Sequence, residues 1–501
     1  MYNSSSDLSA HLLPAELWTV PLTLKSLCGF FAGCADFQKR KIDVGLEDGA
    51  SVWVCWIDGL ISSAEIAESI LRPLTQPGRF PVRSQEELFP LLRRGGISCA
   101  SVTEVTAFSL LSEKLNRGFC AVVFGDLQKA LCFEVKSGNT RAVSEPTLEK
   151  SLKGSKDSFV ETLRTNTALV RRRLATPLLK VLESDLGRKS HTCVALLYLD
   201  GVADNALVDE LARRLDRIDV DAVSSLGQLE ELLADCPRSP FPQLLHTERP
   251  DRLARHLLDG RMGLLVDGFP IALVLPVTFA EFMKVSGDGN MNFLFSTVLT
   301  VLRYLSLVLA LLLPAVYVAI TKFHPEMIPS ALLQSMIEAK RDVPFSTAAE
   351  VIGLLLAFAL LQEAGLRLPN PIGDTVSIIG ALIVGQSAVD ARLVSPIAII
   401  VVALSGICCY TLPSQDLSMA IRLFRLLLLL LAAATGLYGI CLGCCLMFLL
   451  LSEMSSLGLN YTDPLSGGQG GGFLRLLWRS PQRDIKTRDA ALSPNDRRRQ
   501  R

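Results

Sequence analysis

Six polar side chains lie within or beside long apolar stretches in the second half of the chain. They are Glu350, Glu363, Arg367, Asp374, Gln386 and Asp390. Charge is costly in hydrocarbon, so such groups face protein, water or the interface, and they often mark ion paths. Glu350 and Asp390 are the better candidates for an internal site. For Arg367 and Asp374, a loop at the membrane surface explains the same residues equally well.

No pattern in the chain predicts catalysis. The first 290 residues contain no G-x-G-x-x-G, Walker loop, H-E-x-x-H or C-x-x-C pair. Cys441, Cys444 and Cys445 lie close together, but in an apolar stretch without histidine, which favours packing over metal binding. We therefore expect no enzyme activity, no metal and no cofactor.

A run of three arginines, Arg171 to Arg173, could bind anionic lipid or nucleic acid. No aromatic side chains are interleaved with them, as stacking on bases would require. A solvated or salt-bridged helix face is the favoured interpretation, and we expect no nucleic-acid partner.

Three Asp-Gly pairs are candidate structural turns: Asp58-Gly59, Asp200-Gly201 and Asp267-Gly268. An aspartate after a strand can bind phosphate or metal in an α/β fold. The favoured interpretation is that each pair supplies a tight turn, because glycine tolerates positive φ.

The first half of the chain has an internal repeat. Residues 51–74 and 192–215 each have an apolar strand, an Asp-Gly pair and an amphipathic helix. A hairpin pattern follows at 118–135 and at 261–276, and the spacing from the first turn to the hairpin turn is nearly equal. The repeat predicts two similar α/β subdomains.

These patterns predict a duplicated α/β cytosolic domain followed by an α-helical transmembrane bundle. The expected parts are an N-terminal segment 1–44, a first α/β subdomain 45–138, a charged helical connector 139–187, a second α/β subdomain 188–285, a transmembrane helical domain 294–451 and a polar, Arg-rich tail 452–501. Acidic and basic residues number 50 each, so the net charge does not indicate a class of binding partner. No signal peptide pattern opens the chain, which favours a cytosolic first half.

Five apolar segments, at about 294–320, 346–362, 374–391, 393–410 and 423–451, predict insertion into a lipid bilayer. Mean hydropathy is +0.37. Five crossings from a cytosolic domain would leave the Arg-rich tail outside, against the positive-inside rule. Either the second or third segment does not cross fully, or the fifth is broken near residues 436–443.

The membrane half resembles the GerA family of spore germination proteins, which includes the A-type subunits of germinant receptors and SpoVAF-type relatives. The most specific stretches are HPEMIP at 324–329, EAGLRLP at 363–369 and GALIVGQ at 380–386. The resemblance covers about 45–465. The chain departs from the family pattern at SGDGNMNF, 286–293, and after Tyr461, which leaves the branch open.

The resemblance implies a protein of the spore inner membrane that acts beside a transporter-like B subunit and a lipoprotein C subunit. It also implies a homo-oligomeric ring that passes ions when nutrients are sensed. Two other hypotheses remain: a structural scaffold without conduction of its own, and, with less support, a membrane enzyme or active transporter.

Overall fold

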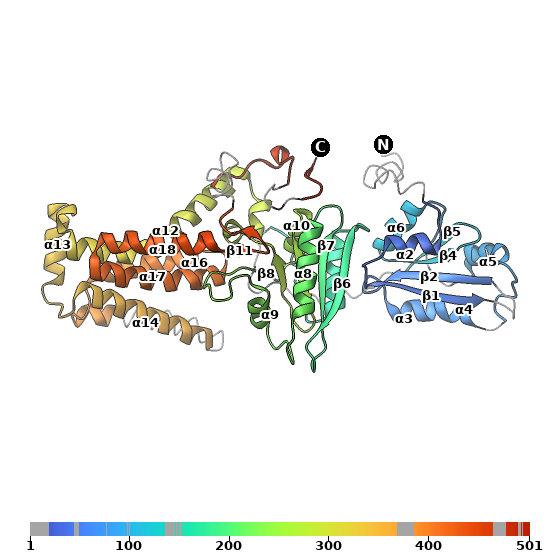
Figure 1. Ribbon diagram of the computed structural model, residues 1–501, viewed down its shortest axis with the longest axis horizontal. Helices are drawn as coiled ribbons and strands as arrows, with labels where there is room; N and C mark the ends of the chain where they lie inside the picture. The colour runs from blue at the N-terminus through green and yellow to red at the C-terminus, as the bar shows by residue number, and fades with distance from the viewer. Residues whose placement is uncertain are drawn as a thin grey trace. The chain divides into compact units, whose positions relative to one another are not determined.

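The protein is described from a computed structural model, which covers residues 20–44, 50–135, 153–367, 385–463 and 477–500, together with 146 and 149 and without 77, 98, 100, 489–491 and 493. The chain divides into two compact units (Figure 1). The first, the α/β unit, contains Met1–Ala234, Leu244–Pro276 and Ile485–Arg501. The second, the helical unit, contains Asp235–Gln243 and Val277–Asp484.

The first sheet of the α/β unit has five antiparallel strands in the order β1-β2-β4-β5-β3. They are β1 Phe37–Val44, β2 Ala50–Ile57, β3 Val102–Val105, β4 Phe119–Phe124 and β5 Lys129–Glu134. The helical segments are α2 Leu24–Phe30, α3 Ser63–Ile66, η2 Ala67–Leu71, α4 Arg72–Thr75, α5 Gln85–Leu91, η3 Leu92–Gly96 and α6 Phe108–Asn116. Every residue of β4 is buried, which explains why this strand is apolar throughout rather than alternating.

The second sheet also has five antiparallel strands, in the order β6-β7-β9-β10-β8. They are β6 Leu179–Leu186, β7 Thr192–Leu199, β8 Leu245–Thr247, β9 Met262–Val266 and β10 Ala272–Leu275. The helices are α7 Leu163–Arg173, α8 Asn205–Arg217, α9 Leu226–Leu233 and α10 Pro250–Leu258. Counted within each sheet, the two strand orders are the same. A duplication would produce this, and the duplication itself stays a prediction.

Both predicted hairpins, β4–β5 and β9–β10, are confirmed. The sheets, however, begin earlier than the predicted boundaries at 45 and 188. β1 lies in the expected N-terminal segment, and β6 lies in the expected connector. Both are terminal strands of their sheets in which charged residues interrupt the apolar ones, so they lack the apolar runs that revealed β2 and β7. Most of β1 is exposed, whereas β6 is largely buried or half-buried.

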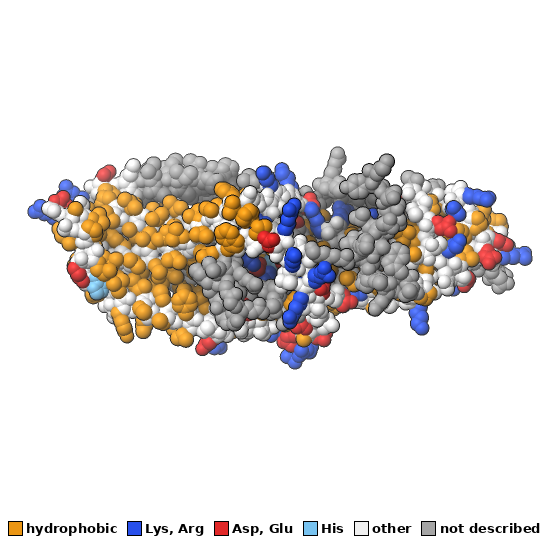
Figure 2. All heavy atoms as spheres, turned by 90° about the horizontal axis from the view of Figure 1, so that it is seen from above, with side chains coloured by type: hydrophobic (Ala, Val, Ile, Leu, Met, Phe, Trp, Pro, Cys, Tyr) orange, Lys and Arg blue, Asp and Glu red, His pale blue; other side chains and the backbone are white. Residues whose placement is uncertain are grey.

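In its described residues, the helical unit has five apolar helices and several short elements. Its elements are α11 Phe279–Phe282, η4 Ser286–Asn290, α12 Phe293–Phe323, η5 Pro325–Met327, α13 Ser330–Lys340, α14 Thr347–Arg367, α16 Pro396–Tyr410, α17 Gln415–Thr435, α18 Leu437–Glu453, β11 Ser455–Ser456, β12 Leu459–Asn460 and η6 Gln482–Asp484. Three described stretches are long and apolar enough to cross a membrane: Phe293–Phe323, Thr347–Ala364 and Gln415–Thr435. Figure 2 shows hydrophobic side chains gathered over these helices.

The predicted fifth segment is two helices, not one. α17 ends and α18 begins at Gly436, whose φ of +69° a glycine adopts readily. Lys322 Nζ donates to the Ala433 carbonyl at 2.7 Å, so α12 and α17 end together and run in the same direction. α18 then runs back. The structure therefore has a break in the fifth segment, which was one of the alternatives that would leave the Arg-rich tail in the cytosol. Most of the predicted third segment lies outside the described residues.

The chain after α18 forms a clasp, Met454–Tyr461, with the hairpin β11–β12 at its centre. Tyr461 is fully buried, and its hydroxyl donates to the Pro242 carbonyl at 2.7 Å. Ser456 Oγ donates to the Gln243 carbonyl at 3.2 Å, and the Phe279 amide donates to the Tyr461 carbonyl at 2.8 Å. This part of the expected polar tail is thus a packed element that holds the loop between α9 and β8.

Candidate functional site

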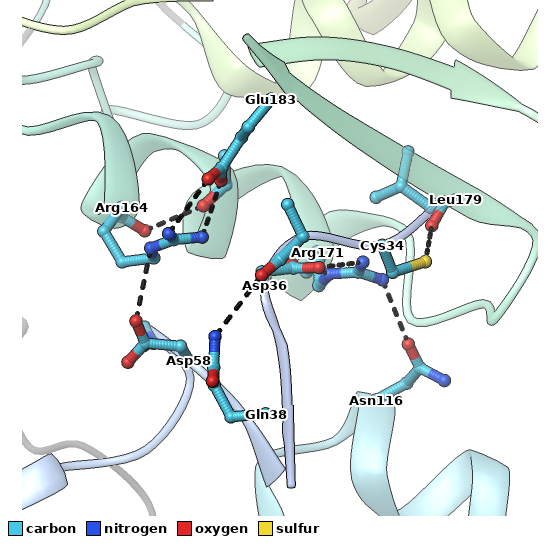
Figure 3. Close-up of polar contacts among 12 residues, drawn as sticks. Cys34, Asp36, Gln38, Asp58, Asn116, Arg164, Arg171, Leu179 and Glu183 are labelled. Atoms are coloured by element: carbon cyan, nitrogen blue, oxygen red, sulfur yellow. Dashed lines mark hydrogen bonds and ion pairs between the residues drawn. The ribbon is translucent and has the colours of Figure 1, made fainter. Parts of the chain in front are cut away.

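A buried ion pair joins the two sheets of the α/β unit. Arg171 from α7 and Asp36, just before β1, are each essentially inaccessible to solvent. Arg171 Nη2 donates to Asp36 Oδ1 at 2.7 Å, Nε donates to the other carboxylate oxygen, and Nη1 reaches Asn116 Oδ1 at 3.3 Å (Figure 3). Burial works against the charged guanidinium, but Asp36 outweighs it, so the pKa of Arg171 is raised.

Two further ion pairs, which share Arg164 and are partly exposed, lie beside the first. Arg164 Nη1 lies 2.7 Å from Glu183 Oε1 on β6, and its Nε lies 3.2 Å from Asp58 Oδ2 at the end of β2 (Figure 3). Gly59 follows with φ +86°, and a Cβ there would lie 2.8 Å from the Arg164 carbonyl. The first Asp-Gly turn is therefore packed directly against α7.

Backbone pairing completes this junction, which we define as the contacts of α7 and residues 33–36 with both sheets. The Ala35 amide donates to the Val181 carbonyl at 3.0 Å, and the Val181 amide donates to the Gly33 carbonyl at 3.1 Å. The segment before β1 thus pairs with β6, the end strand of the second sheet. The charged groups are engaged with one another, so the junction fixes two subdomains rather than presenting a reactive group.

The other Asp-Gly pairs also form turns. Gly201 has φ +75° and Gly268 has φ +85°. Asp267 Oδ1 accepts the Leu163 amide at 2.9 Å, which satisfies a free N–H at the first turn of α7. The geometry at these positions is that of turns and caps.

Glu350 lies on α14 in the helical unit. Of the predicted polar candidates that the structure describes, it is the buried acidic residue. It is 2% exposed. One carboxylate oxygen accepts the amide of Ser395, the residue that caps α16, while Oε2 is buried without a partner among the described atoms. Tyr317 of α12 packs against the apolar cluster that contains Val351 of α14 and Ala398 of α16. Three apolar helices therefore meet around one carboxylate.

The remaining candidates are not gathered around Glu350. Glu363, Gln386 and Asp390 are exposed in the isolated chain. Arg367 is the last residue of α14, and Asp374 lies outside the described residues. No part of the described chain brings these side chains into one cluster.

A buried arginine, absent from the predicted set, lies in the middle of α17. Arg425 is 6% exposed, and its Nη1 donates to Ser405 Oγ of α16 at 3.0 Å. Ser405 in turn donates to the Ala310 carbonyl of α12 at 3.1 Å. The signal was present in the sequence, since Arg425 is the one charge in 423–451, but the apolar run suggested only a membrane crossing.

Neither a metal centre nor an activated thiol is evident in the described part of the chain. No group of three or more His, Cys, Asp or Glu side chains there could hold a metal ion. Burial raises the pKa of the Cys55 and Cys132 thiols to about 12, which makes them poor nucleophiles near neutral pH.

Comparison with known proteins assigns these features to a family. Residues 24–491 match the family model described as Bacillus/Clostridium GerA spore germination protein. The uncharacterized membrane protein YfkQ of Bacillus subtilis is 38% identical over 88% of this chain and 85% of its own length. Spore germination protein KA of B. subtilis is 35% identical over 93% and 85%. Spore germination protein B1 of B. subtilis is 32% identical over 89% and 92%.

Among solved structures, the N-terminal domain of the A subunit of the Bacillus megaterium spore germinant receptor GerK3 matches 52% of this chain and 97% of that chain. Its sequence identity is 24% and its TM-score is 0.39. The family match spans the stretches at 324–329, 363–369 and 380–386, and with these relatives it shows that this chain belongs to the GerA family of spore germination proteins.

Proposed function

We propose that the chain is the membrane-embedded A-type subunit of a spore germination receptor, and that its helices pass ions when nutrients are sensed. In this proposal the chain lies in the inner membrane of the spore, with the α/β unit in the cytosol. It forms a homo-oligomer, works with a transporter-like B subunit and a lipoprotein C subunit, and catalyses no reaction.

The observation that carries the conduction proposal is the buried Glu350. A carboxylate oxygen that has no partner within the described residues is expensive between apolar helices, so its retention favours a function over mere anchoring. Arg425, deep in the same bundle and bonded to Ser405, supports the same interpretation. A plain lipid anchor needs neither group.

The direction of the helices supports the proposed orientation. Because α18 runs back, the clasp lies beside Phe279, close to where α12 begins. The chain before α12 and the chain after α18 are therefore at the same end of the bundle. With that end in the cytosol, the Arg-rich tail satisfies the positive-inside rule.

The test replaces Glu350 with Gln in the full chain, co-expressed with its B and C partners in spores. We expect nutrient-triggered ion release to slow at least tenfold, with normal protein levels in the spore membrane. Glu338→Gln is the matched control, because Glu338 is an exposed carboxylate of the same unit, on α13, and lies outside the set of candidate ion-path residues. Unchanged release in Glu350→Gln, together with an absence of conductance in reconstituted bilayers, would refute the conduction proposal.

A scaffold function is the second candidate, because the junction and the clasp are extensively hydrogen-bonded features without reactive groups. A scaffold would hold the complex while another subunit conducts. Ion release that stays normal after the helices of this subunit are crosslinked together would favour the scaffold, whereas blocked release would favour conduction.

A further inference from the structure

Helix α12 is too long for the hydrocarbon layer it would cross. Its 31 residues are about 46 Å long at 1.5 Å per residue, against a hydrocarbon thickness of about 30 Å. The excess of about 16 Å, or about ten residues, must be taken up by tilt or must lie outside the hydrocarbon.

Polar contacts along its first turns show which end lies outside. Arg303 forms a two-pronged ion pair with Asp288 of η4, with Nη1 2.6 Å from Oδ2 and Nη2 2.7 Å from Oδ1. The Arg479 amide donates to Thr297 Oγ1 at 3.2 Å, and its guanidinium donates to the carbonyl of Gly289 at 3.3 Å. We call these four side chains, of Asp288, Thr297, Arg303 and Arg479, the collar.

The collar and the irregular backbone of η4 cannot lie in hydrocarbon without a large penalty. The hydrocarbon therefore begins beyond Arg303. The residues from 304 to 323 then number 20, which matches the length of one membrane crossing. The first three turns of α12 lie at or above the membrane surface.

The face of α12 opposite Arg303 is apolar and exposed. Five of its positions, which we call the stripe, are Leu294, Val298, Val301, Leu305 and Val308, each between 44% and 63% exposed. Phe295 and Leu302, at 56% and 51% exposed, flank the stripe on one side. The stripe's spacing of four, three, four and three residues is the heptad spacing of a helix–helix seam. Beyond Val308, no large apolar side chain of α12 is exposed until Phe323, because α14, α16 and α17 pack around it.

We propose that the stripe is the seam along which α12 of a second copy of this chain packs. Its first part lies at the level of the collar, where an uncovered apolar surface of this kind indicates a protein partner. The stripe has no charge, so two copies meet without repulsion. It also continues in one register from the surface into the membrane. In a second copy that has the same orientation in the membrane, α12 runs parallel, so the two stripes face each other over their whole length.

This inference rests on the proposed homo-oligomer and names the surface that forms it. The test places single cysteines in the full chain in lipid vesicles and oxidises them. Val298→Cys is expected to give a covalent dimer well above the wild-type background from native cysteines. Thr300→Cys is the matched control, because it lies on the collar side of the same helix and should stay at background.

A second variant tests whether the seam drives assembly. Val301→Asp, added to Val298→Cys, should reduce the crosslinked dimer at least fivefold, whereas Thr300→Asp should not. Three results would overturn the proposal: a dimer no stronger than background, a crosslink to a different polypeptide, or strong quenching of a fluorophore at position 298 by brominated lipid. Vesicles without an ion gradient report assembly alone, so a failure here is distinct from a failure of conduction.

Discussion

The charge of Asp36 should decide whether the two subdomains of the α/β unit stay joined. Asp36→Asn keeps the shape of the side chain but removes its charge. The Arg171 guanidinium then remains buried with one strong partner lost, and the 3.3 Å contact with Asn116 cannot replace it. Removing one member of a buried ion pair typically costs about 3–5 kcal/mol.

Two amides report directly on this junction, because the Ala35 and Val181 N–H groups donate across it. Hydrogen exchange of the full chain in nanodiscs measures their opening. A loss of about 3–5 kcal/mol corresponds to exchange that is faster by about two to four powers of ten. Amides at the centre of each sheet, such as those of β4 and β9, should change less.

Arg173→Ala is the control, because its ion pair with Asp157 is substantially exposed and should contribute at most about 1 kcal/mol. Replacing both buried partners, with Asp36→Leu and Arg171→Met, should restore slow exchange, since a packed apolar pair leaves no charge unpaired. If Asp36→Asn changes exchange less than fivefold, the ion pair does not hold the junction and this reasoning is wrong.

Three further predictions concern stability. Gly59→Ala should destabilise the protein by about 2–4 kcal/mol, because the new Cβ meets a backbone carbonyl at 2.8 Å. Gly201→Ala has open space around it and should cost about 1 kcal/mol. Thermal unfolding measures both, and equal effects would contradict the packing argument. Folding raises the pKa of Cys55 and Cys132 to about 12 from an ordinary value near 9. The contribution of the two neutral thiols to the free energy of unfolding is therefore complete below pH 9 and is lost as the pH rises toward 12. The double variant with alanine at both cysteines should therefore show a shallower loss of unfolding free energy between pH 9 and 11 than the wild type, and parallel curves would disprove this. Tyr461→Phe should cost about 1–3 kcal/mol in denaturant unfolding, because a buried carbonyl loses its donor, and a neutral result would mean that water replaces the hydroxyl.

Local patterns predicted much of the fold because the signals were local. The strand, Asp-Gly and helix sequence at 51–74 and at 192–215 needed no distant partner to be read. The end strands β1 and β6 were missed because their charged residues interrupt the apolar pattern that marks a strand. The break at Gly436 was only one of several alternatives, because hydropathy carries no information about φ.

The candidate site was harder to predict because its members come from distant parts of the chain. Asp36 and Arg171 are 135 residues apart, and the arginine run suggested a solvated or salt-bridged face without naming a partner. Glu350 was selected as a polar group in an apolar stretch, but its burial and its contact with the Ser395 amide depend on how α14 and α16 pack. Helix packing is a tertiary property that periodicity alone does not give.

The clasp has a consequence for how the protein is made. Tyr461 closes over a loop that left the ribosome about 220 residues earlier, so that loop stays uncovered until every membrane helix has been synthesised. Chains that end prematurely, or that insert one helix wrongly, cannot place Tyr461 and leave Phe279 and Phe282 without the contact of its ring. Exposed aromatic surface of this kind is what proteases and chaperones recognise, so the clasp would let the cell distinguish finished chains from unfinished ones.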